Sequence, residues 1–344
     1  LRMVVGMGKN HLKHLNYAGH SNGAWGFGQV YSRALYDHLG NFMHFFGQSH
    51  PQEAAIAHYL RRRMVENGAG PADGRYPVFR FLMTDFEKAP PPVLPGGLPV
   101  ARHFDSVGLV LMSSGFGPDD TYALFSQGGG VMGRRHDFDA THFSIYKQGY
   151  LALDTGARFA LPHSPNYRHQ TVAHNCVLIH MPGERFPRSA TGPVIANTAG
   201  QNRWPQEARA LAFETDRRYA YTATDATSVY HADKCGQIVR QFIYLPPDHF
   251  VVFDRVTSKR AEYAKTWLLH TANEPTVAGK EFRAVQDRGR IFCRTLYPLD
   301  AVLETIGGPG KEFWADGRNW AITDRFQLPG AGDWWKHYGR GYTE

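Results

Sequence analysis

One stretch of the sequence divides the chain into two parts that differ in periodicity. Residues 88–99 hold five prolines and two glycines. A cluster of that density neither continues a helix nor lies in a central strand. We therefore expect a helical segment over residues 1–88, a linker over residues 89–99 and an antiparallel β-sandwich over residues 100–344. A chain of 344 residues is long enough for about two domains.

The part before the linker has apolar residues at helical spacing. Residues 29–46 place apolar side chains three or four positions apart, with Gly40 near the middle. Pro51 opens a second run over residues 52–66, which ends before Asn67 and Gly68, a typical helix stop. Two antiparallel helices therefore account for most of residues 1–67.

The part after the linker has the pattern of strands. Short apolar stretches alternate with turn residues, and no convincing helix lies between them, which is typical of a large antiparallel sandwich. The candidate strands cover residues 108–112, 122–125, 142–146, 150–153, 177–179, 219–222, 238–244, 250–253, 265–269 and 290–296. The predicted fold class is mainly β, a sandwich preceded by a short helical segment.

Charge and composition narrow the partners. The 38 Lys and Arg outnumber the 31 Asp and Glu, which gives a net charge of +7 and favours an acidic polysaccharide or nucleic acid. Basic and aromatic residues are not interleaved as in nucleic-acid-binding segments, so we expect no nucleic acid. No apolar run approaches the roughly 20 residues of a membrane helix, so we expect no membrane. Three cysteines are too few for a disulfide framework or a CxxC metal site.

The start of the chain carries no leader pattern. It opens at Leu1 without a basic and then apolar stretch. We expect no signal peptide in it, and a chain that is either processed or part of a longer one.

Histidines concentrate in one region. Six of the 18 fall between residues 136 and 180, where Asp154 also stands between apolar neighbours and Gly156. A buried aspartate is costly unless it is paired or bound to metal. Imidazole and carboxylate groups from different strands suit a Zn²⁺-type site. Any one of these histidines alone is better interpreted as a hydrogen-bonded core residue, but together they favour a site.

Three motifs in this region resemble a known family. The order Phe-Asp-x-x-x-Phe-x-Ile-Tyr, Leu-Ala-Leu-Asp-Thr-Gly and Thr-Val-Ala-His-Asn is similar to the C-terminal sheet domain of heparinase II/III-like polysaccharide lyases. The resemblance covers roughly residues 98–325, and its last two motifs are the most specific. The two N-terminal helices resemble the end of the α/α toroid that precedes this sheet domain in the family.

The resemblance implies one divalent metal, zinc before manganese or calcium, held by a His, an Asp and a His. Asp154 matches the aspartate, and His174 matches the second histidine. We expect His136 to be the first ligand, with Asp137 as the alternative.

The first ligand of the family usually lies in a His-x-His-x-Asp motif. An ungapped match places Arg135, Asp137 and Asp139 on it, and a shift by one residue places Arg134 and His136 on its two histidine positions. The shift restores the ligand histidine but not the catalytic one.

The family's second functional stretch is a Gly-x-x-Tyr segment on a toroid helix, whose Tyr acts as acid and often as base. Residues 22–29 resemble it, with Gly26 where the Tyr is expected. Tyr17 and Tyr31 are the nearby phenols. We take these two, with Arg135 at the motif's histidine position, as candidate catalytic residues.

The chemistry implied by the resemblance is β-elimination next to a uronate carboxylate. Neutralising that carboxylate lowers the pKa of the C5 proton. A base then removes the proton, and an acid protonates the departing O4. Each candidate for binding the sugar has a plain structural alternative, a solvated charge or a core side chain. These candidates are Trp25, Arg134, Arg135, Arg168, Lys147, His169 and Asn175.

Two functions remain open at this point. The first expectation is a polysaccharide lyase of the bacterial periplasm or cell exterior, and we leave open whether it forms a homodimer. The alternative, favoured by Gly26 and Arg135, is a non-catalytic carbohydrate-binding or structural relative that has lost the Tyr/His pair. A nucleophile elbow at residues 19–23 is rejected, because no good strand precedes it and no βα units follow.

Overall fold

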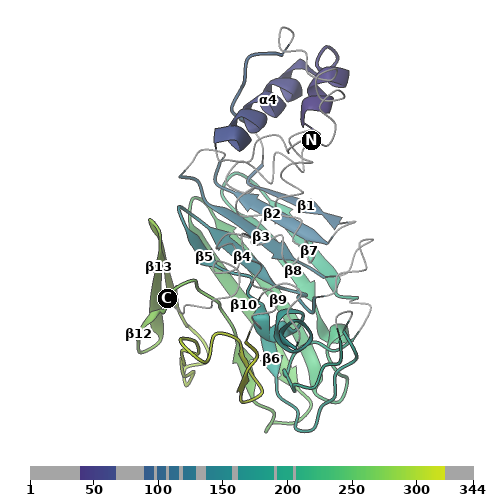
Figure 1. The fold of residues 1–344 in the computed structure, drawn as a ribbon, viewed down its shortest axis with the longest axis vertical. Coiled ribbons are helices and arrows are strands. Elements are labelled where there is room, and N and C mark those ends of the chain that lie inside the picture. The colour runs from purple at the N-terminus through teal and green to yellow at the C-terminus, as the bar shows by residue number, and fades with distance from the viewer. Residues whose placement is uncertain are drawn as a thin grey trace, which may run out of the picture.

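The centre of the molecule is a pair of antiparallel sheets packed face to face (Figure 1). The structure is a computed structural model. It describes residues 39–66, 89–96, 99–105, 108–115, 119–128, 137–156, 162–189, 192–203 and 207–321.

The first sheet is a meander of five strands in the order β1-β2-β3-β4-β5. Its strands are β1 (Ala101–Phe104), β2 (Leu109–Ser113), β3 (Tyr122–Ser126), β4 (Phe143–Tyr146) and β5 (Tyr150–Ala152). The second sheet has the order β10-β9-β8-β7. Its strands are β7 (Arg209–Thr215), β8 (Ala220–Asp225), β9 (Cys235–Leu245) and β10 (His249–Ser258).

Aromatic side chains join the two sheets. Phe242 on β9 lies against Phe125 on β3 and Phe143 on β4, with ring centroids 5.4 and 5.1 Å apart. Tilted aromatic pairs of this kind add to the free energy gained by burying their area. The shared core confirms the sandwich that the strand pattern predicted.

Smaller elements surround the sandwich. β6 (Val177–Ile179) pairs with β11 (Lys265–Trp267), and β15 (Trp314–Ala315) pairs with β16 (Arg318–Asn319). A separate three-stranded sheet consists of β12 (Thr276–Ala278), β13 (Glu281–Gln286) and β14 (Gly289–Arg294). Short helical turns cover Ser164–Arg168, Thr171–Ala173 and Thr227–Val229.

The helical expectations agree with the part of the chain that is described. The run predicted over residues 52–66 is α4 (Pro51–Glu66), and residues 39–46 are helical, while residues 29–38 lie outside the described residues. None of the described helices is long and apolar enough to cross a membrane.

The proline-rich segment contacts α4. Residues 89–96 form neither helix nor strand. The amide of Val93 donates to the carbonyl of Ala55 (3.1 Å), and Nδ1 of His58 donates to the carbonyl of Pro90 (2.7 Å). The expected linker is therefore hydrogen-bonded to the helix in its described part. The boundaries expected at residues 88 and 99 stay predictions.

Candidate functional site

Asp154 and His174, the two most specific motif residues, face each other in the interior. Asp154 follows β5, and His174 follows the helical turn Thr171–Ala173. Oδ1 of Asp154 lies 2.7 Å from Nδ1 of His174, and each side chain is 1% exposed. The hydroxyl of Thr155 donates to the carbonyl of Ala173 at 2.8 Å and holds the two segments together beside the pair.

The outward atoms of this pair have no hydrogen-bond partner among the described residues. These two atoms are Nε2 of His174 and Oδ2 of Asp154, and both are buried. Such groups are costly to leave unsatisfied. An imidazole nitrogen and a carboxylate oxygen are the ligands that Zn²⁺ takes, and a carboxylate on the other ring nitrogen is the usual way to orient a ligand histidine. The pair therefore supplies one imidazole and one carboxylate, the donor types of a zinc site.

A third ligand is not among the described side chains. No group of three or more His, Cys, Asp or Glu that could hold a metal occurs within the ranges that the structure describes. His136, the expected first ligand, lies outside the described residues, as do Arg134, Arg135 and the remaining catalytic and aromatic candidates. These are Tyr17, Trp25 and Tyr31.

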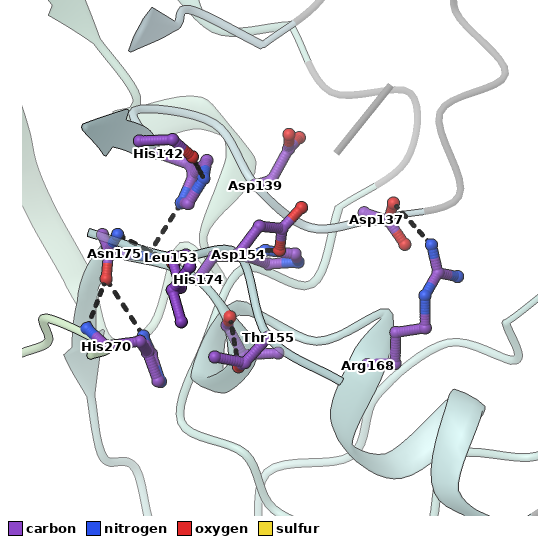
Figure 2. A network of polar contacts seen from close by, with 12 residues as sticks. Asp137, Asp139, His142, Leu153, Asp154, Thr155, Arg168, His174, Asn175 and His270 are labelled. Atoms are coloured by element: carbon purple, nitrogen blue, oxygen red, sulfur yellow. Dashed lines mark hydrogen bonds and ion pairs between the residues drawn. The ribbon is translucent and has the colours of Figure 1, made fainter. Parts of the chain in front are cut away.

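Carboxylates surround the imidazole of His174 (Figure 2). Burial alone lowers the pKa of His174, but Asp154 and, further away, Asp139 and Asp137 oppose this and raise it overall. Burial raises the pKa of Asp154, against the charge of His174. The cluster therefore attracts positive charge, either a proton or a cation.

Asp137 belongs to a second buried cluster. Its Oδ1 lies 2.5 Å from Nδ1 of His169, and its Oδ2 lies 3.7 Å from Nη2 of Arg168. Burial raises the pKa of Asp137, but the charges of Arg168 and His169 outweigh burial and hold the pKa well below its usual range. The alternative ligand Asp137 is thus an ionised partner of these two residues.

Arg168 and His169, expected to bind substrate, are turned inward. Each residue is 2% exposed, so the structure presents both to Asp137 rather than to solvent. Lys147, by contrast, is partly exposed and forms an ion pair with Asp248 at 2.8 Å.

Asn175, the fourth expected substrate-binding residue that is described, is a structural clamp. Its Nδ2 donates to the carbonyls of Phe143 (2.8 Å) and Leu153 (2.9 Å). Its Oδ1 accepts from the backbone amide of His270 at 2.7 Å and lies 3.0 Å from the Nδ1 of that residue. An amide makes at most four such bonds, so none is left for a ligand. Figure 2 shows this clamp beside the pair.

Two further histidines lie near the pair in roles that the sequence did not indicate. The ring of His142 lies 5.4 Å from that of His174, and its Nδ1 accepts the backbone amide of Asn175 at 2.9 Å. Burial lowers the pKa of His142 well below its ordinary value and that of His270 to about 4. Both are therefore neutral hydrogen-bonding residues at neutral pH.

Comparison with known proteins gives structural neighbours only. No model of a known protein family matches the chain, and no curated protein does. Similar solved structures include a heparinase III with methylated lysines (15% identity, TM-score 0.43, covering 70% of this chain and 30% of that one). They also include the heparan sulfate lyase HepC from Pedobacter heparinus (13%, 0.45, 76% and 35%) and another heparinase III (16%, 0.43, 74% and 35%).

These neighbours carry the name of the group that the sequence motifs resemble. The chain spans about a third of their length.

Proposed function

We propose that this chain is the sheet part of a polysaccharide lyase that binds a divalent metal and cleaves a uronate-containing acidic polysaccharide by β-elimination. One observation carries the proposal. Asp154 and His174, brought together from two separate motifs, each bury an atom that has no hydrogen-bond partner among the described residues. That arrangement fits a bound cation better than a finished core.

The metal would be held by His174, by Asp154 and by His136. Nitrogen and oxygen donors of this kind favour zinc, with manganese or calcium as alternatives. When bound, the ion supplies a fixed positive charge that joins the end of β5 to the segment after the helical turn Thr171–Ala173.

The acid–base steps fall to residues before Asp137. Arg134 and Arg135 stand two or three positions before Asp137 in the sequence. A guanidinium binds a carboxylate with two parallel hydrogen bonds and so neutralises the uronate. Tyr17 or Tyr31 would then accept the C5 proton and return a proton to the departing O4.

Metal binding is the first test. We expect purified protein to hold about one zinc per chain, H174N and D154N to lose it, and H169N, a matched buried histidine outside the pair, to keep it. Metal analysis and a Co²⁺ absorption spectrum measure this, and a chelator should lower the melting temperature of the wild type and of H169N but not that of H174N or D154N. A wild type that takes up no Zn²⁺ when incubated with excess metal contradicts the site.

Cleavage is the second test. Heparan sulfate, chondroitin, hyaluronan, alginate and ulvan are incubated with the protein, and the ultraviolet absorbance of unsaturated uronates is followed. We expect product from at least one polymer, and a loss of about a hundredfold or more in Y17F, Y31F or R135Q, whichever residue acts.

Binding without cleavage supports the second candidate, a carbohydrate-binding relative. Gly26 and Arg135, at the expected Tyr and His positions, favour it. Retention on the polymer with no absorbing product from any of the five would overturn the lyase proposal and leave the metal site standing. For either function we propose a location in the bacterial periplasm or outside the cell, as the resemblance implies, and an acidic polysaccharide as partner.

A further inference from the structure

The three-stranded sheet β12-β13-β14 packs one of its faces on the sandwich. Ala284 on β13 lies directly opposite Ile291 on β14 in the register, and Ile291 packs against the sandwich core. The turn between these strands is fixed to β5, because Oε1 of Gln286 accepts the backbone amide of Tyr150 at 2.6 Å. Figure 1 shows β12 and β13 at the side of the sandwich.

The opposite face of this sheet is exposed and basic. Arg283 lies directly opposite Phe292, and Arg290 and Arg294 flank Phe292 on the same face of β14. We call these four residues the arginine face. All four side chains are exposed, and Phe292 is 74% exposed.

Little on this face compensates the positive charge. Among the described residues, Arg294 approaches Glu281 at 3.4 Å, but Arg283 and Arg290 form no ion pair. Residues two apart on a strand stand about 7 Å apart and directly opposite residues about 5 Å apart. Three arginine positions thus flank one exposed phenylalanine within the width of two strands.

This chemistry fits an anionic chain with apolar ring faces. Guanidinium groups bind carboxylate or sulfate with two hydrogen bonds each, and an aromatic ring gives the C–H face of a sugar a surface on which to pack. A protein interface would have a larger apolar centre, depleted in charge. A single aromatic ring is also a poor platform for a run of stacked bases.

We propose that the arginine face is a second binding surface for an acidic polysaccharide, separate from Asp154 and His174. The choice of this occupant rests on the function proposed above. The surface holds a long polymer beside the reacting segment, so it lowers KM for long chains and has no effect on short oligosaccharides.

Binding is measured as Kd and as salt-dependent elution from immobilised heparin and alginate, in the Y17F/Y31F background so that the polymer is not cleaved. We expect R283Q/R290Q/R294Q to raise Kd about tenfold or more and to weaken the salt dependence. F292A should lower retention at high salt, where charge is screened. R217Q/R218Q/R260Q, which removes the same charge from other exposed positions, should leave Kd within about twofold.

Three outcomes would overturn the proposal: unchanged retention in the R283Q/R290Q/R294Q variant, an equal loss in the R217Q/R218Q/R260Q control, or displacement by duplex DNA but not by free alginate. The experiments test the proposed surface separately from the proposed lyase activity. If no polymer is cleaved but the R283Q/R290Q/R294Q variant still loses retention, the surface stands without the enzyme. If cleavage occurs and retention does not change, the enzyme stands without the surface.

Discussion

His163 illustrates how strongly the interior controls single ionisable residues. Its side chain is buried, Nδ1 donates to the carbonyl of Trp320 at 2.6 Å, and its ring meets that of Phe313 edge to face at 4.5 Å. Burial lowers the pKa of His163 from 6.5 to about 3, against the hydrogen bond to Trp320. The imidazole is therefore neutral in the folded protein above about pH 4.

This depressed pKa predicts a loss of stability in mild acid. Between pH 6.5 and pH 3 the unfolded chain binds a proton at His163 that the folded chain does not, so the free energy of unfolding falls as the pH falls. The share of His163 is about 2 kcal/mol between about pH 7.5 and pH 5. H163N keeps a donor near Nδ1 but cannot titrate. Urea unfolding at both pH values should show a dependence on pH shallower by that amount, and an identical dependence in H163N would refute the assignment.

Among the site residues, only those in local motifs could be found from the sequence. Asp154 and His174 stand in two distinctive stretches, and the structure brings them within hydrogen-bond distance. The pairing of Asp137 with His169 joins residues 32 positions apart and has no local signature. Asn175 was found for the wrong reason, because a motif position does not reveal whether an amide serves a ligand or the chain itself.

At the scale of elements, β9 and β10 share a buried ion pair that reaches the site. Arg240 and Asp254 lie directly opposite each other, with Nε–Oδ1 and Nη2–Oδ2 distances of 2.8 Å. Nη1 of Arg240 also donates to the carbonyls of Thr141 and Asn175. One side chain thus ties the second sheet to the segment before β4 and to the motif of His174.

Replacing Arg240 should therefore be costly. In R240K a single ammonium cannot reproduce the fork, and in D254N a buried guanidinium keeps no counter-charge, so we expect each to lower the free energy of unfolding by about 3 kcal/mol or more. R218K, at an exposed pair with Asp216, is the control and should change stability by less than about 0.5 kcal/mol. Denaturant titrations compare them, and a near-neutral R240K would mean that β9 does not depend on the fork.

The strand pattern predicted the sandwich core better than its margins. All ten candidate strands overlap strands of the structure, and most of those in the two main sheets have buried side chains. β7 was missed, because Arg209-Ala-Leu-Ala has few residues of high strand propensity and the first residues of the strand are exposed. β12 and β13 were missed for a related reason, as most of their side chains face solvent.

At the scale of the whole molecule, a buried ion pair fastens the long segment after β6 to the connection before β9. Nζ of Lys234 lies 2.7 Å from Oε2 of Glu184, and both side chains are 0% exposed. The ammonium also donates to the carbonyl of Gly200 at 2.6 Å, and Asn202 donates to the other oxygen of Glu184 at 2.7 Å. Burial raises the pKa of Glu184 and lowers that of Lys234, and each partner's charge opposes the effect.

This pair predicts that removing both charges destabilises the protein less than removing one of them. E184Q leaves a buried ammonium without its counter-charge and should cost about 3–5 kcal/mol of unfolding free energy. E184L/K234M removes both charges and should cost less than E184Q alone. Thermal or denaturant unfolding gives the free energies of unfolding of the wild type, E184Q and E184L/K234M. A double variant less stable than E184Q would argue that the charges themselves are required.

The hydrogen bonds between the proline-rich segment and α4 determine where a truncated form of the protein should begin. Removing the helix alone would strip residues 89–96 of the surface on which they lie, and cutting inside them would uncover one side of the helix. A truncation that begins at β1 avoids both problems, because residues 89–96 and α4 are then deleted together. Protein engineers who wish to express the strands by themselves should start there.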